Sequence, residues 1–195
     1  MVGPASVPPA AMGIKGARLG KAEMRGWSEG RMGRVMLLLM LLLPLDLSAM
    51  EVIAGRVQEV LGGDSFRIGN RLIRLRDLEV WDRGQSCPDS EGKPFPCGEE
   101  SVLFLKSLVE GKRLTCQLKH RDKQRRWIAL CRVDGLDVGA QMVRMGHAVP
   151  AWSRGRYRKE KNQARRHMAG GWRGLPEYGP KRPSQWRRQQ RKLGL

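Results

Sequence analysis

Residues 52–78, "VIAGRVQEVLGGDSFRIGNRLIRLRDL", decide the fold because they contain three short runs with strand character. The runs are separated by two turn signals, "GGDS" and "GN", which are built from residues that favour tight turns. In the last run, "RLIRLRDL", two sets of side chains alternate with a period of two, which is typical of a strand whose faces meet different surroundings. The stretch therefore predicts a three-stranded meander.

The sequence downstream predicts a helix, a hairpin and two further helices. The first helix is expected over "GEESVLFLKSLVEG", which has apolar residues on one side, two acids in its first turn and a glycine after its end. A hairpin over 114–133 follows, then a short helix "VGAQMVRMG" and a basic helix "GRYRKEKNQARRHMAGG". Five short strands with a helix between the third and fourth indicate a mainly β fold with α, a five-stranded barrel of the oligonucleotide- and oligosaccharide-binding (OB) type with about three helices.

Composition limits the size of the core and the kind of partner. With 195 residues and 41% hydrophobic residues, the chain can bury one ordinary core but not two large ones. The net charge of +18 points to a polyanion, a class that includes nucleic acid, anionic lipid and acidic glycan. The charge is concentrated near the end of the chain, because residues 154–195 hold 14 Lys or Arg and two acidic residues.

Residues 1–49 have the order of a secretory signal: a basic leader, an apolar run and small residues at the exit. The apolar run 35–45 has 11 residues, whereas a membrane-spanning helix needs about 20. We therefore expect a signal peptide and an exported protein, periplasmic or secreted. The alternative is a retained N-terminal anchor that holds the protein at the membrane through residues 35–49.

The cysteines are consistent with export. All four lie after the apolar run, and an even number in an exported chain predicts disulfides. Cys116 and Cys131 are equidistant from the centre of the expected hairpin, so folding places them opposite each other and leaves Cys87 to pair with Cys97. A zinc site is the competing interpretation, but the sequence has no CxxC motif and its three histidines lie elsewhere.

Charged residues crowd together at the end of the third predicted strand. Residues 74–83 contain three carboxylates and three guanidinium groups. Cleavage of a phosphodiester needs an activated water and positive charge that stabilises the phosphate in the transition state. A hard cation held by carboxylates assists both needs.

The order of six motifs resembles the thermonuclease family, the staphylococcal-nuclease-like domains. The motifs are "GGDS", "IRLRDLEVWD", "CGEESVLFLKSLVEGKRLTC", "RDKQRRWIALC", "LDVGAQMVRMGHAV" and "YRKEKNQARRHMAGGW", and they cover residues 52–173 without large gaps. The cysteines and the tail "WRGLPEYGPKRPSQWRR" resemble the exported bacterial members in particular. The resemblance implies a five-stranded barrel with helices and a calcium-assisted phosphodiesterase that acts on DNA and RNA.

The resemblance also assigns roles to five residues. It implies Asp64 and Glu79 as ligands of Ca²⁺, Asp82 as the general base, and Arg74 and Arg126 as the arginines that clamp the phosphate.

This sequence departs from the family pattern at four points. Glu79 is one methylene longer than the usual Asp, and Asp82 is one shorter than the usual Glu. Trp81 replaces a proline, and Gln124 with Arg125 replaces Tyr-Gly. A misplacement near 1 Å can cost on the order of 100-fold in rate. Weak activity, altered metal preference and loss of catalysis all stay open.

Residues outside the cluster complete the predictions. Further contacts to nucleic acid are expected from Tyr157, Lys159, Arg187 and Arg188. The three histidines are expected to be structural or solvent-facing. The domain is expected over 50–173, with 174–195 a basic, flexible tail whose three prolines make it a poor helix.

The sequence thus predicts a monomeric calcium-dependent nuclease for DNA and RNA. One alternative is a noncatalytic OB-fold module that binds nucleic acid or another polyanion. Another is an envelope-associated protein whose basic tail binds anionic lipid or glycan.

Overall fold

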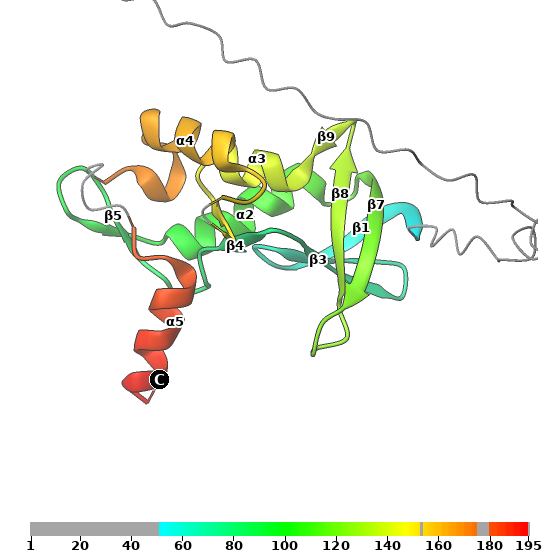
Figure 1. The fold of residues 1–195 in the computed structure, drawn as a ribbon, viewed down its shortest axis with the longest axis horizontal. Helices are drawn as coiled ribbons and strands as arrows, with labels where there is room; N and C mark the ends of the chain where they lie inside the picture. The colour runs from blue at the N-terminus through cyan, green and yellow to red at the C-terminus, as the bar shows by residue number, and fades with distance from the viewer. Residues whose placement is uncertain (1–50, 153, 175–179, 195) are drawn as a thin grey trace, which may run out of the picture. The chain divides into compact units, whose positions relative to one another are not determined.

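The computed structural model describes residues 51–152, 154–174 and 180–194 (Figure 1). They all belong to one compact unit of the chain, Ser48–Leu195. The predicted signal peptide or anchor, residues 1–49, lies outside the described residues. Within the described residues, no helix is long and apolar enough to cross a membrane.

Five strands form a closed barrel. They are β1 (Val52–Gly62), β2 (Ser65–Ile68), β3 (Arg71–Leu75), β7 (Arg113–Arg121) and β8 (Trp127–Val133). Their order is β3-β2-β1-β7-β8, and β3 also pairs with β8, which closes the ring. All neighbours are antiparallel except β3 and β8, which run parallel. The barrel and the predicted meander over 52–78 are confirmed. The short strand β9 (Leu136–Asp137) pairs antiparallel with the end of β8.

The barrel interior is filled from alternating positions of the strands. Val57, Phe66 and Ile73 are almost completely buried and come from three successive strands. Leu114 on β7 and Ala129 on β8 complete the same apolar cluster. Successive residues of a strand point to opposite faces of the sheet. The strand residues that alternate with these buried side chains therefore lie at the surface or at the barrel ends.

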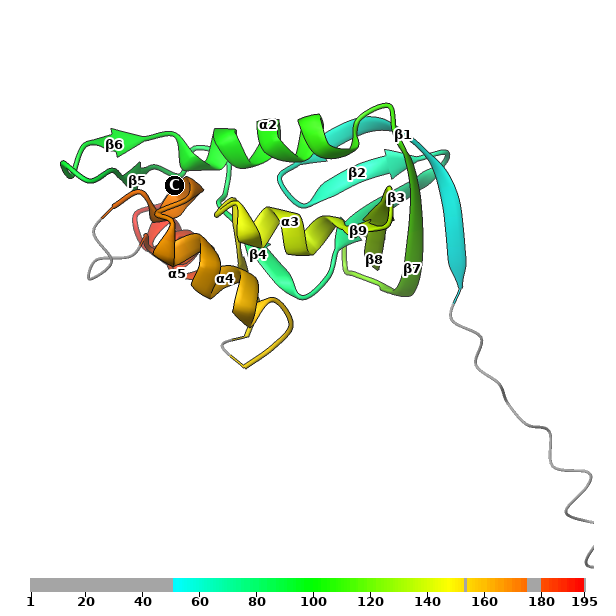
Figure 2. The same cartoon turned by 90° about the horizontal axis from the view of Figure 1, so that it is seen from above.

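Helices cover the barrel in the predicted order. The described helices are α2 (Cys97–Val109), α3 (Val138–Arg144), α4 (Arg158–Arg166) and α5 (Pro183–Lys192), with a 3-10 turn at Gly170–Trp172. Figure 2 shows α2 and α3 beside the strands, and α4 and α5 at the end away from β7. Leu105 and Val109 bury the inner side of α2 against the core. Asp137 begins α3 by accepting a hydrogen bond from the Ala140 N–H at 3.0 Å.

Two small sheets lie outside the barrel. Strand β4 (Leu78–Val80) pairs with β10 (Ala148–Pro150), and β5 (Cys87–Pro88) pairs with β6 (Pro94–Phe95). Asp77 turns the chain from β3 into β4 with a φ of 65°. The chain therefore leaves the barrel immediately after β3, and the acidic residues of 79–82 lie at the barrel end.

Both predicted disulfides are confirmed. Cys116 and Cys131 are direct partners in the register of β7 and β8, with their Cα atoms 4.1 Å apart. Cys87 and Cys97 join the β5 loop to the start of α2, with a Cα separation of 5.6 Å. Cys116 and Cys131 are 15 positions apart in the sequence. Closing a loop of about 15 residues stabilises a fold by about 3 kcal/mol in the chain-entropy estimate.

The expectation of a poor helix in the tail is wrong for residues 183–192. Pro183 stands at the start of α5, where its missing N–H and fixed φ suit the first turn of a helix. The Pro183 side chain is buried, so the proline also anchors the helix to the rest of the unit. Proline therefore begins α5 instead of preventing it.

Candidate active site

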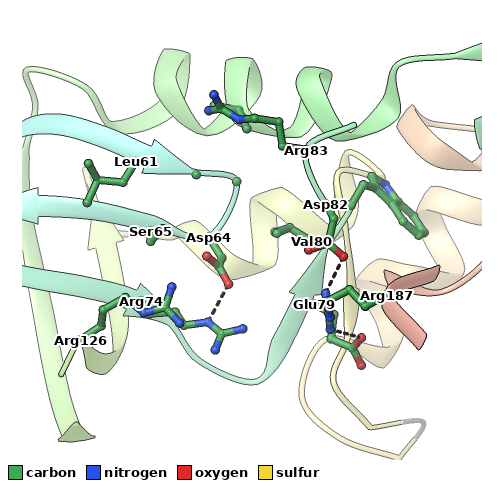
Figure 3. Close-up of a pocket in the computed structure, with 14 residues that line it drawn as sticks. Leu61, Asp64, Ser65, Arg74, Glu79, Val80, Asp82, Arg83, Arg126 and Arg187 are labelled. Atoms are coloured by element: carbon green, nitrogen blue, oxygen red, sulfur yellow. Dashed lines mark hydrogen bonds and ion pairs between the residues drawn. The ribbon is translucent and has the colours of Figure 1, made fainter. Parts of the chain in front are cut away.

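A pocket of about 500 Å³ lies where the barrel end meets β4 and α5 (Figure 3). The pocket is lined by all five residues for which the resemblance implies a role in the reaction: Asp64, Arg74, Glu79, Asp82 and Arg126. They come from the β1–β2 turn, β3, β4, the loop after β4 and the residue before β8. The structure therefore brings together residues that are up to 62 positions apart in the sequence. Their individual roles stay predictions.

Asp64 and Arg74 form a close ion pair on one side of the pocket. Arg74 Nε donates to Asp64 Oδ2 at 2.7 Å. The register explains this contact, because Ser65 and Arg74 are direct partners in the β2–β3 pairing. The Leu75 N–H also donates to the Asp64 carbonyl at 2.8 Å, which fixes the turn against β3. Burial lowers the pKa of Arg74, but the Asp64 carboxylate outweighs it and raises that pKa overall, so Arg74 stays charged.

Asp122 positions the second arginine and was not predicted from the sequence. Arg126 donates from Nε at 2.8 Å and from Nη2 at 2.7 Å to Asp122 Oδ2. The other carboxylate oxygen accepts the backbone N–H groups of Gln124 and Arg126, each at 3.0 Å. Burial alone would raise the pKa of Asp122, but these hydrogen bonds lower it. The signal in the sequence is the Asp at the start of a hairpin turn, which ordinary turn chemistry also explains.

Asp122 also connects the two arginines. Its Oδ2 atom lies 3.9 Å from Arg74 Nη1, in addition to its contacts with Arg126. Arg126 directly precedes β8, and β8 is the neighbour of β3, because Arg74 on β3 pairs with Ile128 on β8. Two guanidinium groups thus line one pocket with a shared carboxylate between them.

Helix α5 supplies the other side of the pocket. Arg187 Nη1 lies 2.6 Å from Asp82 Oδ2, and Arg187 Nη2 lies 3.5 Å from Glu79 Oε2. Glu79 Oε1 also accepts from Arg182 Nη2 at 3.1 Å, and Glu79 Oε2 accepts from the Ser184 N–H at 3.0 Å. Figure 3 shows Arg187 between Asp82 and Glu79, opposite the pair of Asp64 and Arg74. Arg182 and Ser184 have no signal in the sequence that assigns them to this site.

The backbone of the Asp82 loop is fixed by two close contacts. Gln85 is almost fully buried; its Oε1 accepts from the Asp82 N–H at 3.2 Å, and its Nε2 donates to the Lys181 carbonyl at 2.7 Å. A Cβ atom on Gly98, at the start of α2, would lie 1.9 Å from the Asp82 carbonyl oxygen. Only glycine therefore allows the loop to lie directly on this helix end.

Burial changes the acidity of Asp82. It raises the pKa of the carboxyl above its usual range, and the neighbouring carboxylates of Asp64 and Glu79 add to this, while Arg187 partly offsets it. A carboxylate with a raised pKa is a stronger base than an ordinary Asp. This property is consistent with the predicted role of Asp82.

A comparison with models of protein families identifies the family of this chain. A model described as staphylococcal nuclease homologue matches residues 72–173, which is more than half of the chain. The chain belongs to this family. Members of the staphylococcal nuclease homologue family are generally nucleases, which supports a nuclease-type function for this chain. A search of curated proteins found no match.

The family match covers part of the pocket. It includes Arg74, Glu79, Asp82 and Arg126, but it begins after Asp64 and ends before α5. The residues of α5 that hold Glu79 and Asp82 therefore lie outside the matched nuclease homologue domain.

Trp81, which departs from the family pattern, is buried and donates from Nε1 to the Gly146 carbonyl at 2.8 Å.

With α5 docked as in this structure, the carboxylates are not arranged to hold the calcium ion that the resemblance implies. Ca²⁺ takes six to eight oxygen ligands, mostly carboxylates and carbonyls. Across 51–152, 154–174 and 180–194, no group of three or more His, Cys, Asp or Glu side chains is arranged to hold a metal ion. Both carboxylate oxygens of Glu79 are instead bonded to α5, and Asp64 is bonded to Arg74.

Tyr157 corrects one of the predicted contacts to nucleic acid. The side chain is only 6% exposed and belongs to the main apolar cluster, so it is not available to stack on a base. Its hydroxyl donates to Asp137 Oδ1 at 3.0 Å. Burial, together with the Asp137 carboxylate, raises the pKa of the Tyr157 hydroxyl. Lys159 on α4 and Arg188 on α5 are exposed, and their contacts to nucleic acid stay predictions.

The histidines lie away from the residues of this pocket. His120 and His167 are exposed, and His147 stacks on Phe104 with ring centroids 4.4 Å apart. Burial lowers the pKa of His147 to about 4. The main pocket is lined by carboxylates and guanidinium groups and by none of these three histidines.

Proposed function

We propose that the protein is a nuclease that hydrolyses the phosphodiester bonds of DNA and RNA. The observation that carries this proposal is the placement of Arg74, on β3, and Arg126, directly before the adjacent strand β8, in the same pocket as Asp82 and with Asp122 in contact with both. Membership of a family that generally consists of nucleases supports the same reaction class.

The two arginines are proposed to bind the phosphate. Guanidinium groups present paired donors that match phosphate oxygens, and they keep their charge at any physiological pH. Their fixed positions mean that little reorganisation is needed as negative charge builds up on the phosphate. Arg74 and Arg126 therefore suit transition-state stabilisation better than a mobile surface lysine would.

Asp82 is proposed to accept the proton of the attacking water. The carboxylate lines the pocket that contains both arginines, and its raised pKa favours proton uptake. A base must be within hydrogen-bond reach of the proton that it removes. Asp82 Oδ2 is held by Arg187, so the base needs either its other oxygen or release from that arginine.

Calcium is the proposed cofactor, with Asp64 and Glu79 as its proposed ligands. A bound divalent cation would supply Lewis acidity toward the phosphate and a more acidic water. Because both Glu79 oxygens accept hydrogen bonds from α5, calcium binding would require Glu79 to leave these donors.

The cellular location is proposed from the disulfides and the N-terminal sequence. Two disulfides are typical of an oxidising environment. We propose export to the periplasm or the medium after removal of residues 1–49, and a monomer as the active form. Retention of 35–49 as a membrane anchor is the alternative.

One observation favours a second candidate, a noncatalytic module that binds nucleic acid or another polyanion. Glu79 and Asp82, which a nuclease would use for chemistry, are both bonded to arginines of the same chain. A pocket closed in this way could retain Arg74 and Arg126 for phosphate binding without hydrolysis.

Cleavage assays separate the two candidates. The mature chain, residues 50–195, is incubated with DNA and with RNA, with calcium or with a chelator. The nuclease is supported if cleavage falls by about 100-fold in Arg74→Ala and in Arg126→Ala. A fall of this size is expected when a donor that stabilises the transition state is lost. Lys123→Ala, an exposed change in the same hairpin tip, is the matched control. Binding without cleavage under every condition supports the noncatalytic module.

A further inference from the structure

We propose that Arg187 of helix α5 and Arg182, which directly precedes the helix, compete with a divalent cation for the Glu79 carboxylate, so that docking of α5 sets the cation requirement of the pocket. The inference rests on the proposed function, because it concerns the same carboxylates. It assigns a role to a helix that lies outside the matched family domain.

The first argument is the number of donors around Glu79. Its two oxygens receive Arg182 Nη2 at 3.1 Å and the Ser184 N–H at 3.0 Å, with Arg187 Nη2 at 3.5 Å. The Glu79 side chain is 17% exposed, so little of it remains open to solvent. A hard cation binds through the same lone pairs of a carboxylate. The helix and the cation therefore cannot use Glu79 in the same way at the same time.

The second argument is charge. Arg187 contacts both Asp82, at 2.6 Å, and Glu79, at 3.5 Å, so two carboxylates share one guanidinium. Like charges in a partly buried site are unfavourable without a neighbouring cation. A guanidinium and a metal ion can each supply this positive charge, so release of one favours binding of the other.

The third argument is that α5 is docked by specific contacts as well as by charge. The buried Gln85 donates to the Lys181 carbonyl at 2.7 Å, and Pro183 is buried at the start of the helix. Arg182 Nη2 also donates to the Pro150 carbonyl at 2.8 Å on strand β10. The docked position of α5 is therefore stabilised by contacts of its own. These contacts disfavour binding of a cation to Glu79, because the helix would have to leave.

Calcium titration calorimetry tests the competition directly. Three forms of the mature chain are compared: wild type, the R182Q/R187Q variant, and a control R191Q/K192Q variant that loses the same charge from exposed positions of the same helix. If occupancy by α5 limits the competent state, R182Q/R187Q binds calcium at least about tenfold more tightly than the control does. Equal affinities in the two variants, weaker binding by R182Q/R187Q, or no calcium binding by any form would overturn the proposal.

Hydrogen exchange on the wild type tests it without a substitution. Amide protons of 184–192 should exchange faster at saturating calcium than in chelator, because the cation displaces the helix from Glu79. Unchanged protection of this segment with calcium bound would contradict the competition. This measurement also covers the case in which R182Q/R187Q does not fold.

The two proposals fail in different ways. Faster exchange of α5 on calcium binding, without cleavage of any nucleic acid, would refute the nuclease and support the competition. Calcium-dependent cleavage with α5 still protected would support the nuclease and refute the competition.

Discussion

Asp122 holds Arg126 through both Nε and Nη2 of the guanidinium, at 2.8 and 2.7 Å. The same carboxylate accepts two backbone N–H groups of the hairpin tip. Asp122 therefore fixes the Arg126 side chain, which lines the pocket, to the backbone of the hairpin turn.

Replacement of Asp122 by Asn should reduce both cleavage and the free energy of unfolding. The amide can still accept the backbone hydrogen bonds, but it loses the charged pairing with Arg126, which is worth about 1.5 to 3 kcal/mol for hydrogen bonds to charged groups. We expect the rate of hydrolysis to fall by about 10- to 100-fold, since each 1.4 kcal/mol is a factor of ten. Single-turnover cleavage and urea denaturation measure the two effects. A rate equal to that of the Lys123→Ala control would show that cleavage does not depend on the contact between Asp122 and Arg126.

Replacement of Gly98 by Ala should displace the Asp82 loop. The added Cβ would lie 1.9 Å from the Asp82 carbonyl oxygen, a backbone atom that cannot rotate away. Such overpacking typically costs about 1 to 3 kcal/mol of the free energy of unfolding. We expect that loss in denaturant melts, together with strongly reduced cleavage. The exposed substitution Glu99→Ala in the same helical turn serves as the control, and a Gly98→Ala protein as stable as this control would contradict the close approach.

Replacement of Arg187 by Gln should raise the pKa of Asp82 further. Burial already raises this pKa, and Arg187 is the group that partly offsets the rise. Without the guanidinium, the Asp82 carboxyl should stay protonated to a higher pH. Carboxyl carbon NMR titration in the absence of divalent cations follows this directly. The exposed Arg191→Gln removes the same charge, and an equal shift in that variant would mean that only the net charge matters.

His147 should make the protein less stable as the pH falls from 6.5 to about 4. Burial lowers the pKa of His147 from 6.5 to about 4, so over this range the unfolded chain binds a proton that the folded chain does not. The full effect is at most about 3 kcal/mol at low pH, because each unit of pKa difference corresponds to about 1.4 kcal/mol. Above pH 6.5 the histidine is neutral in both states, and the penalty is absent.

The variant His147→Phe isolates this contribution because it keeps an aromatic ring against Phe104. Denaturant melts at several pH values should show a flatter stability profile between pH 4 and 6.5 than in wild type. The exposed His167→Gln should follow the wild-type profile, and cleavage should persist in both variants. Parallel profiles for His147→Phe and wild type would place the acid sensitivity elsewhere.

Local patterns in the sequence were sufficient for the barrel and for part of the pocket. The period of two over 72–77 and the mirror spacing of Cys116 and Cys131 are local signals, and the structure confirms the strands and the disulfides. For the pocket, the order of the motifs along the chain carried the resemblance, and the resemblance assigned Asp64, Arg74 and Arg126 to one site.

Contacts between distant segments could not be predicted in the same way. Arg187 meets Asp82 across 105 residues, and no periodicity or spacing encodes that pairing. The propensity of proline to interrupt helices gave the wrong expectation for α5, because Pro183 occupies a first turn. Tyr157 was expected near nucleic acid from its basic neighbours, but packing against the core determines its position.

The parallel pairing of β3 with β8 gives the two sides of the pocket different kinds of rigidity. Arg74 and Arg126 are spaced by a backbone ladder, in which Arg74 and Ile128 are partners, so their separation is as robust as the barrel itself. The surroundings of Glu79 and Asp82 depend on α5 and on Arg182, which precedes it. Proteolytic removal of α5 would thus alter the acidic half of the site and leave the spacing of the arginine pair intact.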